Sequence, residues 1–368
     1  MILIGFIIFI VFALWPSEII KDILIGRNLC IDDEQNIYTH YDSYSIIKYS
    51  PHGKQLLIIG RRGEGPGDIK RIGWFEINPK DSMLYVTELF NGNRRVSIFS
   101  PVTGKYIDNW KFDFNWNEWE CVPYIQFDQF GNVYIEAIKS VWRQYKSFKI
   151  GAHERAVIKY SYAGKKIKEF YRLKSDFEAE QNGKGEATIP QCNYLYWKIH
   201  DNFLFIRENS KTHISVFDLN GELIKEIQLP FLREKFTSKD IDKWEQAIRS
   251  DIELRKGISE GWWDIKFWRK NLPFPKYKNF FGDRMFFDSK GNIYSYRIIA
   301  ENEKVNTWVK TNISSGKSSI INFPHRLYAS KDGYFYFYIK PGNDDDYPSL
   351  LKVEENSIIN EYEGKNEK

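Results

Sequence analysis

The stretch FDQFGNVY at residues 127–134 decides the fold of this chain, because variants of it recur along the whole sequence. Each copy combines an apolar residue, a polar turn and a run rich in residues that favour a pleated, half-buried surface. Asp, Ser or Asn ahead of Gly supplies the positive φ that hairpin turns require. The other copies begin at Ile31, Ile77, Ile199, Phe287 and Tyr328. We interpret these phrases as a series of β-hairpins.

A second phrase, made of a strand, a turn and another strand, alternates strictly with the first. One copy is VIKYSYAGKKIKEFY at residues 157–171. The others begin at Ile46, Val96, Ile214, Thr307 and Leu350. A unit of four strands is therefore repeated six times. Such sheets stack radially as propeller blades, which leaves only short, protected edges. We predict an all-β protein, a six-bladed β-propeller of four-stranded blades.

The spacing of the first phrase is irregular, from 42 to 88 residues, so some blades must carry insertions. The largest, residues 231–282, lies between blades four and five and contains no blade phrase. A hydroxyl cap and an acidic residue at 237–240, followed by apolar residues at helical spacing, predict an amphipathic helix that ends near Gly257. The polar, Gly-bearing residues 174–190 predict a long loop that enters blade four.

The N-terminus differs in kind from the rest. Residues 1–15, MILIGFIIFIVFALW, are almost wholly apolar. This run is shorter than the ~20 residues that span a bilayer, and it suits the core of a signal peptide, although no charged residue precedes it. We expect residues 1–16 to be a signal peptide or an N-terminal membrane anchor; a buried first strand or helix is the alternative. Residues 17–27 would be a linker or an extra strand, and residues 28–364 the propeller.

Composition excludes several classes of function. The 368 residues carry a net charge of only +4, with both signs interspersed, so nothing favours nucleic acid. The three cysteines are too widely spaced for a disulfide framework or a zinc site. The six histidines show no metal-ligand spacing. We therefore expect no metal and no cofactor.

The chain resembles the six-bladed β-propellers of the NHL/TolB-like type, which include exported bacterial proteins. The resemblance rests on the Gly-rich stretch GRRGEGPGDI at residues 60–69 and on two kinds of blade phrase. D-x-x-G-N-[IV]-Y occurs at Asp128 and Asp288, and K-Y-S-x-x-G-K at Lys48 and Lys159. This resemblance implies the fold and an exported protein, but no particular activity.

The aromatic density of the insertion suggests a binding site. Ligand pockets are mostly apolar with a few placed polar groups, and Trp combines a large area with one hydrogen-bond donor. The candidate ligand-binding residues are Trp262, Trp263, Trp268 and Phe274, with Arg269 and Lys270 as polar partners. We expect them to line a cleft between the insertion and the channel mouth. The alternative is a self-packed cap on a blade edge or on one face of the propeller.

The Gly-rich stretch is a weaker candidate. A phosphate-binding loop should open a helix within a βαβ unit, but Pro66 and Gly67 follow and no helical pattern begins. We interpret the glycines as permitting tight turns between blades. Arg61 and Arg62 still make the loop basic, so we include both as candidates for binding a carboxylate ligand.

No arrangement of residues marks a catalytic site. The G-x-S-x-G match around Ser259 follows a predicted helix, whereas a nucleophile elbow joins a strand to a helix. We expect an extracytoplasmic protein, periplasmic, secreted or membrane-anchored, that binds or scaffolds without catalytic residues. Its partner would be a small molecule, a glycan or a protein, and the chain a monomer. A metal-dependent hydrolase or lyase with its site in the channel is the alternative, because the fold alone does not define a function.

Overall fold

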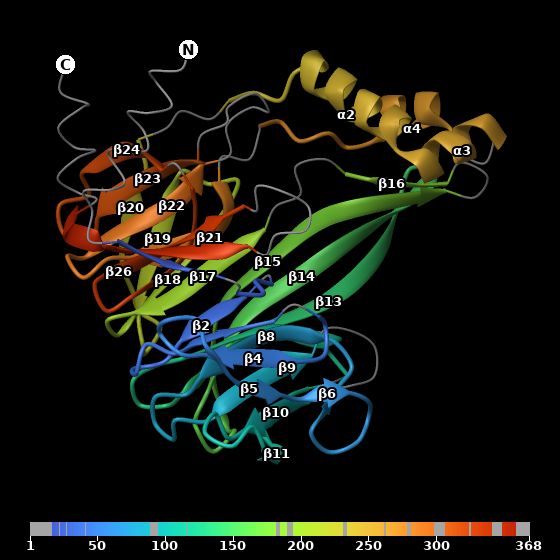
Figure 1. Cartoon of the computed structure of the whole chain (residues 1–368). Coiled ribbons are helices and arrows are strands. Elements are labelled where there is room, and N and C mark those ends of the chain that lie inside the picture. The colour runs from blue at the N-terminus through green and yellow to red at the C-terminus, as the bar shows by residue number, and fades with distance from the viewer. Residues whose placement is uncertain are drawn as a thin grey trace.

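Six small antiparallel sheets are arranged in a ring, which confirms the predicted six-bladed β-propeller (Figure 1). The computed structural model describes residues 17–21, 23–26, 28–40, 42–88, 95–115, 117–181, 185–189, 194–230, 234–260, 263–277, 281–297, 306–323, 325–340 and 348–357. The expected signal peptide or anchor at residues 1–16 lies outside these ranges. No helix within them has the length and apolar character needed to cross a membrane.

The first three blades follow one another along the chain. Blade one contains β2 (Leu29–Ile31), β3 (Ile37–Thr39), β4 (Ile46–Tyr49) and β5 (Gln55–Ile59). A short parallel pair, β6 (Arg61–Arg62) and β7 (Asp68–Ile69), leads to blade two. Blade two contains β8 (Ile72–Ile77), β9 (Leu84–Glu88), β10 (Val96–Phe99) and β11 (Tyr106–Asn109). Blade three has five strands, β12 (Cys121–Phe127), β13 (Val133–Tyr145), β14 (Phe148–Tyr160), β15 (Lys166–Gln181) and β16 (Gly185–Thr188).

The last three blades complete the ring. Blade four contains β17 (Leu195–His200), β18 (Phe203–Glu208), β19 (His213–Asp218) and β20 (Leu223–Gln228). Blade five contains β21 (Phe281–Phe287), β22 (Asn292–Arg297), β23 (Asn306–Asn312) and β24 (Ser318–Phe323). Blade six contains β25 (Arg326–Lys331), β26 (Tyr334–Ile339), β27 (Ser349–Glu354) and, as its fourth strand, β1 (Ser17–Ile20) from the start of the described chain.

The D-x-x-G-N phrases form the turns between the first and second strands of their blades, as predicted. At the turn between β12 and β13, Asp128 Oδ1 accepts hydrogen bonds from the backbone N–H groups of Phe130 (3.0 Å) and Asn132 (2.9 Å). Gly131 takes the left-handed backbone that the turn requires, with φ of 78°. Asp288 makes the equivalent bonds to Lys290 and Asn292 in blade five. The residue types of the phrase therefore follow from the geometry of this turn.

Lysines on the third strand connect these turns to the next blade. Lys159 Nζ lies 3.5 Å from Asp128 Oδ2 and donates to the Leu219 carbonyl oxygen of blade four at 2.9 Å. Lys48 Nζ lies 3.7 Å from Asp32 Oδ2 and donates to the Pro101 carbonyl oxygen of blade two at 3.3 Å. These bonds reinforce the apolar packing between blades.

Apolar clusters fill the space between neighbouring blades all round the ring. Phe75 and Ile46 pack between blades one and two, and Tyr85 and Ile135 between blades two and three. Three further clusters join blade three to four, four to five and five to six. The last cluster, with Ile20, joins blade six to blade one. Each blade thus buries its apolar side chains against two neighbours.

Residues 174–190 differ from the predicted loop. β15 continues to Gln181 and β16 adds a fifth strand to the sheet. Cross-strand ion pairs explain how so polar a segment remains a strand: Lys139 and Lys174 each contact Glu154, at 3.1 and 3.4 Å. β16 and the outer halves of β13, β14 and β15 form an arm that extends beyond the ring (Figure 1).

Three helices form the insertion between blades four and five, α2 (Ser238–Ser250), α3 (Ile252–Glu260) and α4 (Ile265–Asn271). α2 begins where the sequence predicts, and Asp240 accepts hydrogen bonds from the backbone N–H and hydroxyl of Thr237 at 2.8 and 2.7 Å. It ends earlier than predicted, because Asp251 adopts an extended backbone with φ −70° and ψ 129°. Figure 1 shows the helices beside the outer end of the arm.

Candidate functional site in the central channel

The first strands of all six blades surround a central channel. Its cavity has a volume of about 1320 Å³ and is lined by residues of β2, β8, β12, β17, β21 and β25. This volume slightly exceeds the range of about 300–1,000 Å³ that is typical of small-molecule sites. The channel is therefore large enough for an organic ligand.

One residue from each first strand faces the channel at the same level, and we call this set the girdle. Each is the register partner of the aromatic residue near the start of its second strand. The girdle consists of Cys30, Glu76, Gln126, Lys198, Phe286 and Ala329. Because pairing with the second strand fixes the register, the repeat itself decides which position of each first strand faces the channel.

Glu76 is the acidic group of the girdle. Its carboxylate accepts long hydrogen bonds from Trp74 Nε1 and from the Cys30 thiol, both at 3.4 Å. Burial raises the pKa of Glu76 above its ordinary value, and Lys198 acts against this shift. Burial also raises the pKa of Cys30, so this thiol stays protonated and is a poor nucleophile.

Lys198 is the basic group of the girdle and comes from blade four. Its Nζ lies 5.7 Å from the centroid of the Phe286 ring. Burial lowers the pKa of Lys198, and the negative charge of Glu76 acts in the opposite direction. Within the described part of the chain, its ammonium has no hydrogen bond or ion pair. It is thus a cation without a protein counter-ion inside the channel.

Aromatic residues lie two positions before the girdle on blades two, three and four. Trp74, Tyr124 and Tyr196 all line the cavity, and we call them the aromatic layer. The rings of Trp74 and Tyr124 are 4.4 Å apart at an interplanar angle of 63°, and Tyr124 also contacts Trp197 at 4.8 Å. Alternate residues of a strand point to the same side, so the aromatic layer and the girdle form one continuous wall.

The other Lys and Arg side chains of the channel have carboxylate partners. Arg155 pairs with Glu136 at 2.5 Å, and Lys331 with Asp33 at 2.9 Å. Burial would lower the pKa of Lys331, but Asp33 and Asp332 outweigh it and raise the pKa. Each of these cations thus already has a carboxylate partner.

One group of channel residues has the composition of a catalytic triad but not its contacts. Ser140 and His153 are register partners in the arm, and Glu120 lies beside them. The Ser140 hydroxyl donates to Glu120 Oε2 at 3.2 Å, so the acid binds the serine directly, whereas the acid of a triad binds the histidine. His200, which replaces the usual Asp in blade four, stacks on Phe287 at 4.3 Å. Within the described ranges, no three His, Cys, Asp or Glu residues are grouped so as to hold a metal ion.

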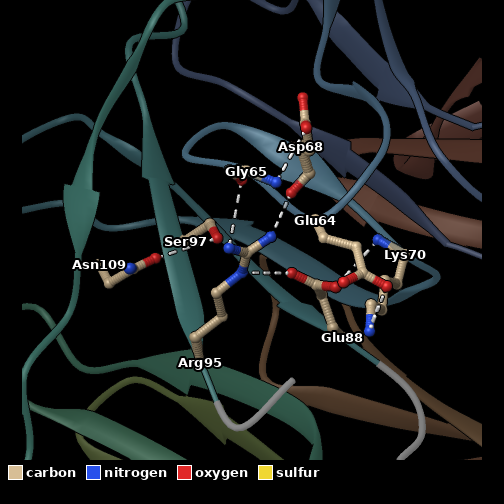
Figure 2. Close-up of polar contacts among 8 residues, drawn as sticks. All are labelled: Glu64, Gly65, Asp68, Lys70, Glu88, Arg95, Ser97 and Asn109. Atoms are coloured by element: carbon tan, nitrogen blue, oxygen red, sulfur yellow. Dashed lines mark hydrogen bonds and ion pairs between the residues drawn. The ribbon is translucent and has the colours of Figure 1, made fainter. Parts of the chain in front are cut away.

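The Gly-rich stretch, residues 60–69, is held in place by Arg95. Figure 2 shows the Arg95 guanidinium between Glu88 and this loop. Arg95 Nε donates to Glu88 Oε1 at 2.8 Å, and its terminal nitrogens donate to the carbonyl oxygens of Gly65 and Asp68. Because the Glu88 side chain is fully buried, this ion pair ties the loop firmly to blade two.

Arg61 and Arg62 do not converge on a common point. Arg61 Nε donates to Asp68 Oδ1 at 2.7 Å within the loop. Arg62 instead lies over the ring of Tyr44, 5.0 Å from its centroid. As neighbours on a strand, the two side chains point to opposite sides. The carboxylate site that we expected of this pair remains untested, and the contacts above give it little support.

The aromatic residues of the insertion pack against the arm. Trp263 and Trp268 are 2% and 0% exposed in a cluster with Phe148 and Ile150 of β14. Phe274 is half-buried against the same cluster, and Trp262 lies outside the described residues. Such burial favours the self-packed alternative for Trp263 and Trp268.

The basic candidates of the insertion are on the surface. Arg269 is paired with Asp242 and Glu245 of α2, both at 2.5 Å, and Lys270 is exposed. These ion pairs join α4 to α2. None of the described insertion residues lines the channel cavity, and the expected cleft between the insertion and the channel mouth stays a prediction.

No protein-family model and no curated protein matches the chain. Among solved structures, a protein from Bacteroides fragilis described as exported matches with a TM-score of 0.55 at 10% identity, over 93% of this chain and 95% of that one. A member of the DUF4221 family from Bacteroides vulgatus matches at 0.47 and 11% identity, over 92% and 97%. A protein of unknown function from Bacteroides thetaiotaomicron matches at 0.45 and 9% identity, over 92% and 75%. The first likeness supports the propeller fold; the other two TM-scores are too low to carry an argument.

Sequence reasoning missed the girdle although the repeat contains the signal for it. In five blades the girdle residue stands two positions before the turn residue, as Glu76 does before Asn78 and Lys198 before His200. An alignment of the six phrases would have shown that the girdle position is acidic in one blade, basic in another and uncharged in the remaining four.

We predict that Trp268→Ala lowers the free energy of unfolding by about 3–5 kcal/mol, as expected for a buried Trp. Denaturant unfolding measures the change. Trp142→Ala, at a site on the arm that is 43% exposed, is the control and should change little. A Trp268→Ala protein with unchanged stability would contradict a core role.

We predict that Glu76→Gln becomes more stable relative to the native protein as pH rises. The unfolded carboxyl loses its proton at its ordinary pKa, whereas the folded one holds it to higher pH. The native protein therefore loses stability as the pH rises from the ordinary pKa of a glutamate to the raised pKa of Glu76, whereas Glu76→Gln does not. The titratable groups that interact with Glu76 are Cys30 on β2, Tyr124 on β12, Lys198 on β17 and Lys331 on β25.

Denaturant midpoints measured from acid to neutral pH test this. Glu64→Gln provides a control of opposite sign, since Lys70 holds the pKa of Glu64 below its ordinary value. A stability difference for Glu76→Gln that does not change with pH would show that Glu76 is not perturbed in the folded protein.

Proposed function

We propose that this chain is an extracytoplasmic, non-catalytic β-propeller of the NHL/TolB-like type that binds a small molecule in its central channel. The observation that carries the proposal is the wall of the cavity, where the aromatic layer stands directly beside the polar girdle. Small-molecule sites combine a mainly apolar surface with a few fixed polar groups in this way. A glycan or a protein segment that enters the channel would meet the same wall.

Binding is favoured over catalysis by the contacts of the channel residues. The Ser140 hydroxyl donates its hydrogen bond to the carboxylate of Glu120, which is a weaker base than the imidazole of a catalytic triad. Cys30 is held as a thiol. The metal-dependent hydrolase or lyase is not proposed, since no group of ligands for it is found among the described residues.

We also propose that the protein acts as a monomer. The large exposed apolar side chains of the outer strands are distributed over several blades, with examples in Ile58 on β5, Ile107 on β11 and Leu223 on β20. Scattered apolar residues of this kind are usual on monomeric proteins.

The extracytoplasmic location rests on the apolar residues 1–15. We predict that fractionation of expressing cells finds the chain outside the cytoplasm, either shortened at its N-terminus or bound to the membrane. Full-length chain recovered from the cytoplasm would contradict this location and leave the binding proposal untouched.

We predict that the uncharged fluorescent probe N-phenylnaphthylamine binds the channel, because its rings can pack on the aromatic layer. Fluorescence titration should show saturable binding that Trp74→Ala and Tyr124→Ala each weaken by about tenfold, the effect of about 1.4 kcal/mol of lost ring contact. Trp142→Ala, an exposed Trp on the arm, is the matched control and should leave binding unchanged. No saturable binding, or no effect of either channel variant, would overturn the proposed function.

A further inference from the structure

We propose that the channel ligand is an organic monoanion whose negative group binds Lys198 and whose ring packs against Trp74 and Tyr124. This inference rests on the proposed function and specifies the chemistry of the ligand.

The first argument is the state of Lys198. Four Lys or Arg side chains line the cavity, and three of them have a carboxylate within 3.7 Å: Lys48, Arg155 and Lys331. Lys198 is the exception among the described residues, and its Nζ lies 5.7 Å from the centroid of the Phe286 ring. A half-buried ammonium without a counter-ion is costly, and a bound anion removes most of that cost.

The second argument limits the charge of the ligand. Among the residues that the structure describes, the channel offers a single unpaired cation, and Glu76 stands in the same girdle on blade two. The two groups influence each other's pKa but form no ion pair. A second negative charge on the ligand would meet Glu76 rather than another cation, so a dianion such as a phosphate monoester is disfavoured.

The third argument concerns the body of the ligand. The wall next to Lys198 consists of rings: Tyr196 precedes it by two residues on β17, and Trp74 and Tyr124 continue the aromatic layer on blades two and three. An inorganic anion would leave this surface bare. A ring, whether aromatic or the apolar face of a sugar acid, would cover it while its acidic group reaches Lys198.

The arm and the helical insertion extend from the same part of the ring. The arm is built from blade three, between the two blades that supply Glu76 and Lys198. Its Ser140, His153 and Arg155 line the cavity. The proposed monoanion site thus lies on the side of the channel from which the arm and the helical insertion extend.

The test compares two probes that differ in charge. Anilinonaphthalenesulfonate carries one negative group on the same ring system as the uncharged N-phenylnaphthylamine. Both are titrated by fluorescence against the native protein and the variants Lys198→Met, Lys198→Gln and Lys198→Arg. Lys80→Met is the matched control, since Lys80 is an exposed lysine that also lies over a ring, 4.3 Å from the centroid of Tyr162.

We expect Lys198→Met and Lys198→Gln to weaken binding of the anionic probe at least about tenfold, the effect of losing one charge-assisted hydrogen bond. Binding of the uncharged probe should change less than about twofold, which also shows that the variants are folded. Lys198→Arg should keep most of the affinity for the anionic probe. Lys80→Met should affect neither probe.

Equal weakening of both probes by Lys198→Met and Lys198→Gln would overturn the proposal, because Lys198 would then only shape the channel. Unchanged affinity for the anionic probe would overturn it as well. If the uncharged probe fails to bind the native protein, the proposed function fails; if only the charge dependence is absent, the channel is a binding site for a neutral ligand and the present inference alone is wrong.

Discussion

The pairing of β1 with β27 is the constraint on which the rest of the structure depends. Ser17 to Ile20 align with Val353 to Leu350, so the two ends of the described chain complete one sheet. A blade of four short strands cannot bury its apolar faces alone, and each depends on the clusters it shares with two neighbours. Closing the ring gives every blade its second neighbour. It also holds six first strands around one axis, and that arrangement creates the channel.

Ring closure brings the girdle residues, which the register of six separate hairpins positions, together in the wall of one channel. Each girdle residue is placed by its pairing with the aromatic residue of the second strand, and this pairing is a property of one hairpin. Only when six hairpins surround the axis do Glu76 and Lys198 share a cavity. The turn below them is fixed just as firmly: Asp128 binds its own turn and Lys159, and Lys159 binds blade four. The site is therefore rigid because the elements that position it are the elements that close the ring.

The outer additions of the fold were harder to predict than its blades. The blade phrases have strong turn chemistry, so six hairpin pairs could be recognised even where blade four lacks the Gly. The arm was missed because residues 174–190 are polar, and they form strands through ion pairs such as Lys174 with Glu154. The aromatic insertion suggested a binding site, yet Trp268 is completely buried, since α4 packs on β14. A Trp that packs in a core and a Trp that binds a ligand have the same sequence signal.

The sequence alone determined the number of blades, the position of every described turn phrase and the start of the helix at Thr237, because these depend on residues close together in the chain. It also contained the girdle, in residues that no local rule distinguishes from others on a strand. The tertiary structure decided which side chains share a cavity, which cations have partners and which remain alone. Those properties depend on distances between residues far apart in sequence, such as Glu76 and Lys198, and such distances exist only once the ring is closed.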